Sequence, residues 1–311
     1  MRTRTETAAC TVLAAMALAA PSPGGQTADP VKTARVNGVE LAYVDHGRGE
    51  AVVLVHGAMH DYRIWAETWP ELAKRNRVIA YSRRHHHPNP PAGKTADYSL
   101  AAHAADLVAL LDELKLDKAH LVGHSAGANV AALVARRHPG RVRKLVLGEP
   151  FLPAILARHP EGQSLMPAFF GTAQEAFQKG DVPGAARILA DGILGPGAYE
   201  AIPAPARQIL LDNLPAQFEA EAATPPDKAA DVLQFTCDEA GRIEAPTLLL
   251  MGEKTARLFW VAIDEVARCM PGAARATLPR ASHALEIDNP AGFVAIVQEF
   301  LSAKAPSAST K

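Results

Sequence analysis

The sequence has little of what marks several specialised classes of protein. Of its 311 residues three are cysteines and 5% are aromatic, and 32 basic against 33 acidic side chains leave a net charge of −1. Three cysteines are too few for a disulfide scaffold, and a balanced charge disfavours a nucleic-acid-binding module. No apolar run reaches the ~20 residues that a membrane-spanning helix requires. What remains is a hydrophobic content of 48%, which is typical of a globular protein.

The N-terminus has the pattern of a secretory signal. Arg2 and Arg4 precede an apolar stretch over residues 10–20 that is broken only by Thr11, and Ala17-Leu18-Ala19 is a cleavage pattern. We expect residues 1–19 to be a signal peptide and the mature protein to be secreted or periplasmic; an unstructured alanine-rich leader is the alternative. Two cysteines then remain in the mature chain, Cys237 and Cys269, and the sequence leaves open whether they pair.

Short apolar runs alternate with helical patterns along most of the chain. Residues 32–37 and 39–45 flank an Asn-Gly turn and predict an antiparallel hairpin. Further strands are predicted at residues 51–55, 77–81, 120–122, 144–147, 247–251 and 275–278. Helices are predicted after Ser99, after Ser125, over residues 258–270 and after Asn289-Pro290. This alternation predicts an α/β fold, with a mostly parallel eight-stranded sheet and helices on both faces.

The alternation stops between residues 150 and 244. This stretch is rich in Pro, Gly and Ala, and its apolar groups lie on short helical patterns. We interpret it as a helical cap inserted between two parts of the core, residues 20–149 and 245–303, with a disordered tail at residues 304–311. The alternative is that it completes the outer layer of the sheet without forming a separate cap.

The most informative motif is Gly123-His124-Ser125-Ala126-Gly127. It follows a predicted strand and precedes a predicted helix, which is the context of a nucleophile elbow. A serine in this sharp turn has its hydroxyl exposed, and the flanking glycines avoid side chains where the backbone is crowded. The motif predicts that Ser125 is a nucleophile.

A serine nucleophile needs a base, which follows it in the chain in this arrangement. Only His138, His159 and His283 come after Ser125. His138 ends a helical pattern, where a cation has a structural role, and His159 lies in the insertion. His283 comes between the last predicted strand and the last predicted helix, in a loop that can reach the C-terminal edge of the sheet. We therefore expect His283 to be the base.

An oxyanion hole needs backbone N–H groups that point at the reacting carbonyl. Ala126 directly follows Ser125 and supplies one N–H at a helix N-terminus. The second should come from the loop after an earlier strand, where His56-Gly57-Ala58 is found, and we assign it to Ala58. A simple glycine turn is the alternative interpretation of this loop.

Together these motifs resemble the α/β-hydrolase fold superfamily over residues 31–303. In many members an Asp lies three positions beyond the Gly that ends the seventh strand, but here Thr255 holds that position after Gly252. Another branch, of the zearalenone-lactonase type, has its acid at the end of the sixth strand, where this chain has Glu149. The resemblance therefore implies that Glu149 orients His283. Glu253 is the alternative acid, and it could equally be a solvated loop carboxylate.

A second departure from the family lies in the loop over residues 81–90. It contains Arg83 and three consecutive histidines, of which His86 is the middle one. Neighbouring histidines rarely point at one centre, so we expect no metal site. Either Arg83 or His86 lines the substrate entrance, or the run is only a polar loop.

The resemblance implies a serine hydrolase that needs no cofactor and acts on a small molecule. We expect a carboxylic ester or lactone, cleaved through an acyl-enzyme on Ser125. Carbon–carbon bond or amide hydrolysis with the same triad is an alternative, and so is a non-catalytic ligand-binding protein on the same fold. The sequence does not specify the substrate, the lining of the pocket or the oligomeric state.

Overall fold

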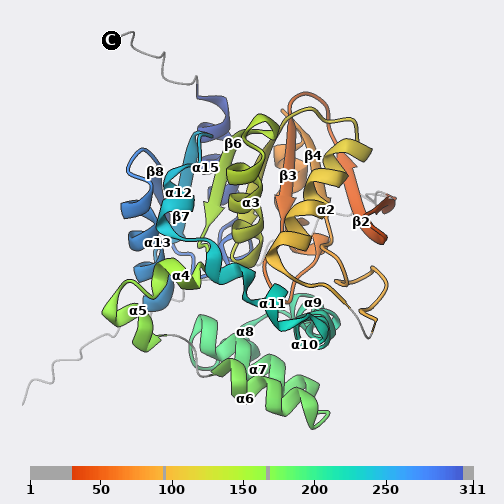
Figure 1. Ribbon diagram of the computed structural model, residues 1–311, viewed down its shortest axis with the longest axis vertical. Coiled ribbons are helices and arrows are strands. Elements are labelled where there is room, and N and C mark those ends of the chain that lie inside the picture. The colour runs from red at the N-terminus through yellow and green to blue at the C-terminus, as the bar shows by residue number, and fades with distance from the viewer. Residues whose placement is uncertain (1–29, 94–95, 166–168, 304–311) are drawn as a thin grey trace, which may run out of the picture. The chain divides into compact units, whose positions relative to one another are not determined.

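Eight strands form one sheet in the described part of the chain (Figure 1). The computed structural model describes residues 30–93, 96–165 and 169–303, so the predicted signal peptide and tail lie outside the described residues. The strands are β1 (Lys32–Val36), β2 (Val39–His46), β3 (Ala51–Val55), β4 (Arg77–Tyr81), β5 (Ala119–His124), β6 (Val142–Gly148), β7 (Thr247–Gly252) and β8 (Ala274–Leu278). Their order is β1-β2-β4-β3-β5-β6-β7-β8; the β1–β2 and β2–β4 pairs are antiparallel and the other neighbours are parallel. The predicted mostly parallel eight-stranded sheet is confirmed.

Helices cover both faces of the sheet, which explains the uniformly apolar strands. Val53 and Val55 of β3 pack on one face with residues of α2 (Leu100–Glu113), α3 (Ala126–Arg137) and α13 (Arg257–Cys269). Val52 and Leu54 point to the other face, where α1 (Trp69–Leu72) and α15 (Pro290–Ser302) lie. Successive side chains of a strand alternate between faces, so a strand with both faces covered must be apolar at every position.

The polar residues that were expected to begin two helices do so. Ser99 accepts a hydrogen bond from the N–H of Ala102 and caps α2. Asn289 accepts one from the N–H of Gly292 and caps α15, with Pro290 at the first helical position. These side chains satisfy N–H groups that have no partner inside the helix.

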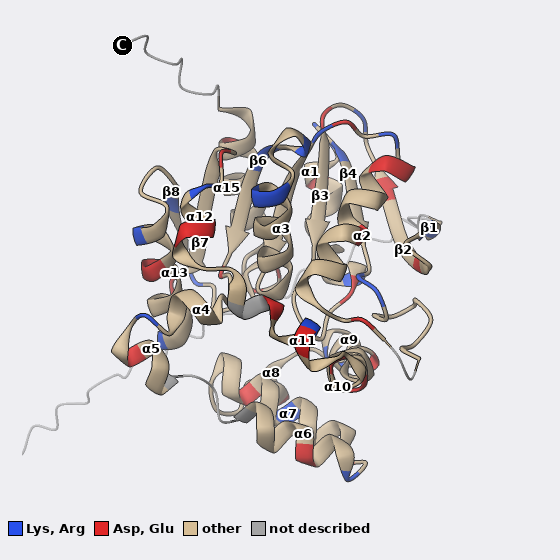
Figure 2. Cartoon of the chain, in the orientation of Figure 1, with Lys and Arg blue, Asp and Glu red and all other residues tan. Residues whose placement is uncertain are grey.

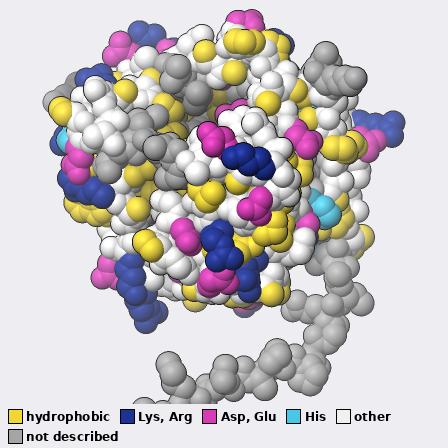
Figure 3. Space-filling view, turned by 90° about the horizontal axis from the view of Figure 1, so that it is seen from below, with side chains coloured by type: hydrophobic (Ala, Val, Ile, Leu, Met, Phe, Trp, Pro, Cys, Tyr) yellow, Lys and Arg dark blue, Asp and Glu magenta, His cyan; other side chains and the backbone are white. Residues whose placement is uncertain are grey.

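The chain between β6 and β7 forms helices, and the described part of residues 150–244 contains no strand. The α-helices are α4 (Pro153–Leu156), α5 (Pro160–Leu165), α6 (Phe169–Gln178), α7 (Val182–Leu194), α8 (Ala198–Ala201), α9 (Ala204–Pro215), α10 (Glu221–Ala223), α11 (Pro226–Ala229) and α12 (Cys237–Gly241). Residues of α6, α7 and α9 share a small apolar core with Met59, which lies in the loop after β3. In Figure 1 α6 to α10 lie beyond one end of the sheet, and Figure 3 looks at that side, where apolar, acidic and basic side chains are mixed.

A disulfide joins Cys237 at the start of α12 to Cys269 at the end of α13. The sequence left this pairing open.

Acidic and basic residues are interspersed along the described elements (Figure 2). None of the described helices has the length and apolar character that crossing a bilayer requires.

Candidate active site

Ser125 lies at the sharp turn between β5 and α3. Its backbone has φ 53° and ψ −122°, a conformation that a residue with a side chain seldom adopts. A Cβ atom on Gly123 would lie 2.5 Å from the carbonyl oxygen of Gly127, and one on Gly127 would lie 2.1 Å from that of Val55. Only glycine fits at these two positions, which accounts for the two glycines of the motif.

His283 and Glu149 meet beside this turn. His283 lies between β8 and α14 (Leu285–Asp288), and Glu149 directly follows β6. The Nδ1 atom of His283 lies 2.5 Å from Oε2 of Glu149, and both side chains are buried. The charge-assisted hydrogen bond fixes the imidazole, with Nδ1–H donating to the carboxylate.

Two more donors hold the Glu149 carboxylate. The N–H of Gly252 donates to Oε1 at 2.7 Å, and the hydroxyl of Thr255 donates to Oε2 at 2.8 Å. Thr255 occupies the position where many family members have their acid, so here that position contacts the acid without providing it. The sequence showed the missing Asp but gave no sign of this contact.

Glu253, the alternative acid, faces elsewhere. Its Oε2 accepts a hydrogen bond from the N–H of Arg280 at 2.7 Å, at an exposed site. The hydrogen bonds and ion pairs among the described residues do not include one between Glu253 and His283. Of the two carboxylates, the structure brings only Glu149 to His283.

An aromatic ring covers the His283 imidazole. Phe259 of α13 stacks on it with ring centroids 3.7 Å apart and planes inclined by 15°. Burial lowers the pKa of His283 below its ordinary value of 6.5, although the Glu149 carboxylate opposes this. The ring is therefore neutral near neutral pH and free to accept a proton at Nε2. Phe259 could not be picked out from the sequence, because its role depends on the packing of α13.

The two predicted oxyanion donors line the same cavity as Ser125. Ala126 begins α3, and Ala58 is in the loop after β3, next to Gly57, whose own Cβ would lie 3.3 Å from that of Ser125. The hydrogen bonds of the described residues include none from the N–H of Ala58 or of Ala126. Unused N–H groups beside a serine hydroxyl are what an oxyanion hole requires.

The nucleophile, the base and the oxyanion donors open onto one cavity of about 710 Å³, lined mostly by apolar side chains. Ala58, Ser125, Ala126 and His283 line it. So do residues of α6, α7 and α9 from the helical region, including Phe170 and Leu210. The hydrogen bonds of the described chain do not include one from Ser125 Oγ to His283; such contacts often form only when substrate is bound.

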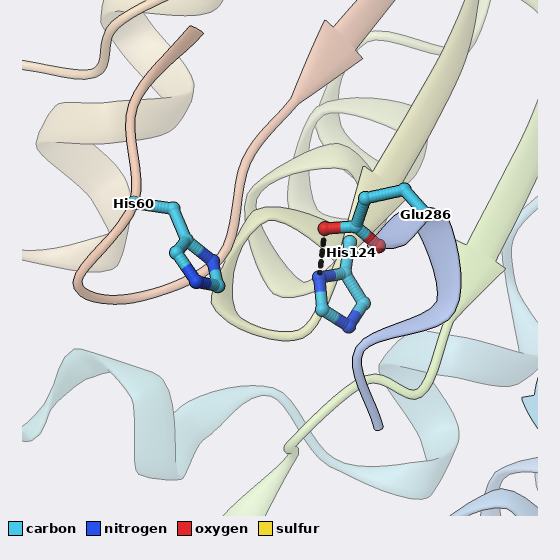
Figure 4. A group of neighbouring side chains, drawn as sticks. All are labelled: His60, His124 and Glu286. Carbon is cyan, nitrogen blue, oxygen red and sulfur yellow. Dashed lines mark ion pairs between the residues drawn. The ribbon is translucent and has the colours of Figure 1, made fainter. Parts of the chain in front are cut away.

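A second histidine–carboxylate pair includes His124, the residue before the nucleophile (Figure 4). His124 Nδ1 is 3.1 Å from Oε1 of Glu286, and its Nε2–H donates to the His283 carbonyl at 2.8 Å. Burial would lower the pKa of His124, but Glu286 outweighs this effect and raises the pKa. Burial would raise the pKa of Glu286, but His124 holds it below its ordinary value. Both shifts favour the charged forms of this pair, and His124 is hydrogen-bonded to the His283 backbone.

His60 lies near this pair, in the loop after β3. One ligand atom from each of His60, His124 and Glu286 lies within 4.8 Å of the other two, a spacing at which a metal could be held. Burial lowers the pKa of His60 to about 4, so this ring is neutral. However, a protonated His124 Nδ1 has no lone pair to offer a metal.

The structure places Arg83 and His86 inside the protein and not at an exposed entrance. Arg83 is 2% exposed and lines the cavity wall. His86 is fully buried and lies outside the cavity lining, with its ring nitrogens 2.6 Å from the carbonyl oxygen of His60 and 2.6 Å from the hydroxyl of Tyr98. The loop after β4 is thus part of the interior wall.

Comparison with known proteins places this geometry in a family. The family model described as "alpha/beta hydrolase fold" matches residues 50–192. The chain is 38% identical over 120 residues to 2-hydroxymuconate semialdehyde hydrolase of Pseudomonas sp. (strain CF600). The match covers 35% of this chain and 40% of that enzyme. The first curated relatives are thus matched over only about two fifths of their length.

Two further relatives match over most of the chain. The sn-1-specific diacylglycerol lipase ABHD11 of Danio rerio is 28% identical over 88% of this chain and 85% of its own. The solved structure of Est816, an N-acyl homoserine lactone degrading enzyme, is 26% identical with a TM-score of 0.69, over 86% of this chain and 100% of its own. With the sheet order, the elbow and the helical region after β6, these matches show that the chain belongs to the alpha/beta hydrolase fold superfamily.

Proposed function

We propose that this protein is a serine hydrolase that cleaves a small-molecule carboxylic ester or lactone through an acyl-enzyme on Ser125. The observation that carries the proposal is the pairing of His283 with Glu149, 2.5 Å apart, beside a strained serine in one cavity. A base oriented by a carboxylate next to a serine is the arrangement that activates a hydroxyl.

In the first half of the reaction, His283 Nε2 takes the proton of Ser125 Oγ as the oxygen attacks the substrate carbonyl. The Ala58 and Ala126 N–H groups stabilise the oxyanion of the tetrahedral intermediate. Glu149 stabilises the imidazolium that forms and holds its ring in place. His283 then gives the proton to the leaving alcohol, which for a lactone stays attached to the acyl group.

In the second half, a water molecule repeats the attack on the acyl-enzyme. His283 takes a proton from the water and returns it to Ser125 Oγ as the acyl–oxygen bond breaks. Each proton and bond is accounted for by the side chains already named, so the scheme uses no cofactor.

Three relatives frame the choice of bond. Their names describe a lipase, a lactone-degrading enzyme and a hydrolase of a semialdehyde. The first two cover most of this chain and favour an ester or lactone. Esters and lactones also have less demanding leaving groups than amides or carbon acids. Carbon–carbon or amide hydrolysis with the same residues is the second candidate, favoured by the more identical but shorter match.

The test is a panel of ethyl esters, γ- and δ-lactones, amides and a vinylogous 1,5-diketone, assayed with the wild type and Ser125→Ala. We expect hydrolysis of an ester or lactone that Ser125→Ala loses. Turnover of the diketone or amide alone would show that the enzyme cleaves a carbon–carbon or amide bond instead of an ester. Binding without turnover of any compound would favour a ligand-binding protein.

We further propose that the protein works in an oxidising compartment outside the cytosol. The N-terminal apolar pattern and the Cys237–Cys269 pair support this, since structural disulfides persist in such compartments. Fractionation of cells that express the full chain, with sequencing of the N-terminus, tests it. A full-length N-terminus in the cytosolic fraction would contradict it.

A further inference from the structure

Arg83 is a buried cation in the wall of the cavity. It follows β4 by two residues, is 2% exposed and lines the same cavity as Ser125 and His283. Its backbone N–H donates to Nε2 of His56 at 2.9 Å, so His56 carries its proton on Nδ1 and donates it to the Gly57 carbonyl at 2.8 Å. The position of Arg83 is therefore tied to the loop that contributes Ala58.

The guanidinium has donors to spare. Nη2 donates to the Gly57 carbonyl at 3.1 Å, Nη1 lies 3.2 Å from Nε2 of His103, and the buried Nε–H has no partner among the described residues. A guanidinium has five N–H groups in a planar fork. In these two contacts each Nη atom uses one of its two N–H groups, so each has a second N–H with which the fork can bind an acceptor with two oxygens.

Arg83 also lacks a counter-charge, unlike the arginine beside it. Arg84 is buried too, but it forms two 2.7 Å hydrogen bonds with Asp106. The ion pairs of the described residues include none for Arg83. Arginine is charged at any physiological pH, and a buried charge without an opposite charge is costly.

The side chains around Arg83 are neutral. Burial holds the pKa of His86 and of His103 well below its ordinary value, and the charge of Arg83 acts in the same direction. Burial does the same to His56, with help from His86 and Arg83. Burial also raises the pKa of Tyr98, which keeps its phenol protonated. None of these groups carries an opposite charge; the Tyr98 ring, whose centroid lies 5.8 Å from the guanidinium carbon, offers only its π face.

The carboxylates elsewhere in the cavity wall have other partners. Asp231 accepts from the N–H groups of Leu100 and Ala101 at the start of α2. Asp288 accepts from the N–H and the hydroxyl of Ser282. Glu221 accepts from Gln217, and burial raises its pKa, which favours its neutral form. An anion for Arg83 must then come with the ligand.

We propose that Arg83 binds a carboxylate group of the substrate, so that the preferred substrate is an ester or lactone of a carboxylic acid that carries a second, free carboxylate. This rests on the proposed function and specifies its substrate class. The planar fork of the guanidinium matches a carboxylate, and the mostly apolar wall accommodates the rest of the molecule.

The geometry also limits the length of the substrate. Arg83 Nη2 is 3.1 Å from the Gly57 oxygen, and the same peptide unit carries the Ala58 N–H on its opposite edge. An oxyanion bound to that N–H lies within about 8 Å of the guanidinium. This suits a spacer of about two to four carbon atoms between the free carboxylate and the scissile carbonyl.

The test compares monoethyl esters of succinic, glutaric and adipic acids with uncharged analogues in which an isopropyl group replaces the carboxylate. We expect the wild type to prefer at least one acid ester in kcat/KM, and Arg83→Met to reduce that preference about 10- to 100-fold. Arg83→Lys keeps the charge without the planar fork, so its preference for the acid ester should lie between those of the wild type and Arg83→Met. Arg84→Lys, at the neighbouring paired arginine, is the control and should leave the ratio unchanged.

Binding separates this inference from the proposed function. Calorimetry with the Ser125→Ala variant should detect the preferred acid ester, and Ser125→Ala/Arg83→Met should bind it at least 10-fold more weakly. Arg83-dependent binding with no turnover by the wild type would uphold the carboxylate site and overturn the hydrolase. Turnover of neutral esters with no preference for the acid esters would uphold the hydrolase and overturn the carboxylate site. Equal losses on charged and neutral esters in Arg83→Met would show that Arg83 only positions the Gly57–Ala58 peptide, which would overturn the inference.

Discussion

The hydroxyl of Thr255 donates a 2.8 Å hydrogen bond to the Glu149 oxygen that also contacts His283. The position after β7 that many relatives use for the acid thus contacts an acid supplied from the end of β6. One oxygen of Glu149 receives both the threonine and the histidine, and the other receives the Gly252 N–H. The carboxylate is held from three sides and has little freedom to turn away from the imidazole.

The Thr255 contact can be tested directly. Thr255→Val removes the donor at nearly constant volume, and we expect kcat/KM to fall roughly 3- to 10-fold because one hydrogen bond to the triad acid is lost. Thr255→Ser keeps the hydroxyl and should restore most of the activity. Equal rates for the valine variant and the wild type would show that Glu149 is held well enough without it.

The pH dependence follows from the burial of His283. The base works only when neutral, so kcat/KM falls as the pH drops through the pKa of His283 in the free enzyme. Burial lowers that pKa below 6.5, so the acid limb should have its midpoint below pH 6.5, with a plateau at neutral pH. A pH profile with a non-ionising ester measures it. A midpoint above 6.5 would mean that Glu149 outweighs burial.

The disulfide should affect stability more than activity. Cys237 and Cys269 are 32 residues apart, and a crosslink over such a loop contributes about 3.7 kcal/mol to the free energy of unfolding. Neither cysteine lines the cavity. A Cys237→Ser/Cys269→Ser variant should therefore unfold at lower denaturant while keeping its kcat at 25 °C. A loss of kcat in a fully folded sample would contradict this separation.

Chelation should leave the activity unchanged. The group of His60, His124 and Glu286 has the spacing of a metal site, but His124 and Glu286 already pair with each other at 3.1 Å. We expect equal rates before and after dialysis against EDTA. If EDTA removed the activity, a divalent metal restored it, and Glu286→Gln prevented this recovery, the group would be shown to bind a metal.

The sequence was sufficient for the features that depend on local pattern. Apolar runs predicted the strands because both faces of the sheet are covered, and Ser99 and Asn289 predicted helix starts because capping is local. The elbow was predictable because a side chain at either of its glycines would clash with backbone atoms a few residues away or in the neighbouring strand.

Features that depend on tertiary packing could not be predicted from the sequence. The stacking of Phe259 on His283 follows from how α13 packs, and the Thr255 contact follows from the alignment of β6 with β7. The sequence left open whether Arg83 or His86 lines the substrate entrance or the run is only a polar loop. The structure buries Arg83, since the loop after β4 folds inward against His56 and Gly57.

The most direct test of the central claim is active-site labelling. The purified protein is treated with a fluorophosphonate, the adduct is mapped by peptide mass spectrometry, and Glu149→Ala and Glu253→Ala are labelled in parallel. We predict an adduct on Ser125 whose formation slows sharply in Glu149→Ala and stays near the wild-type rate in Glu253→Ala. A folded wild-type protein with no adduct on Ser125, or one slowed by the Glu253 variant alone, would contradict the account.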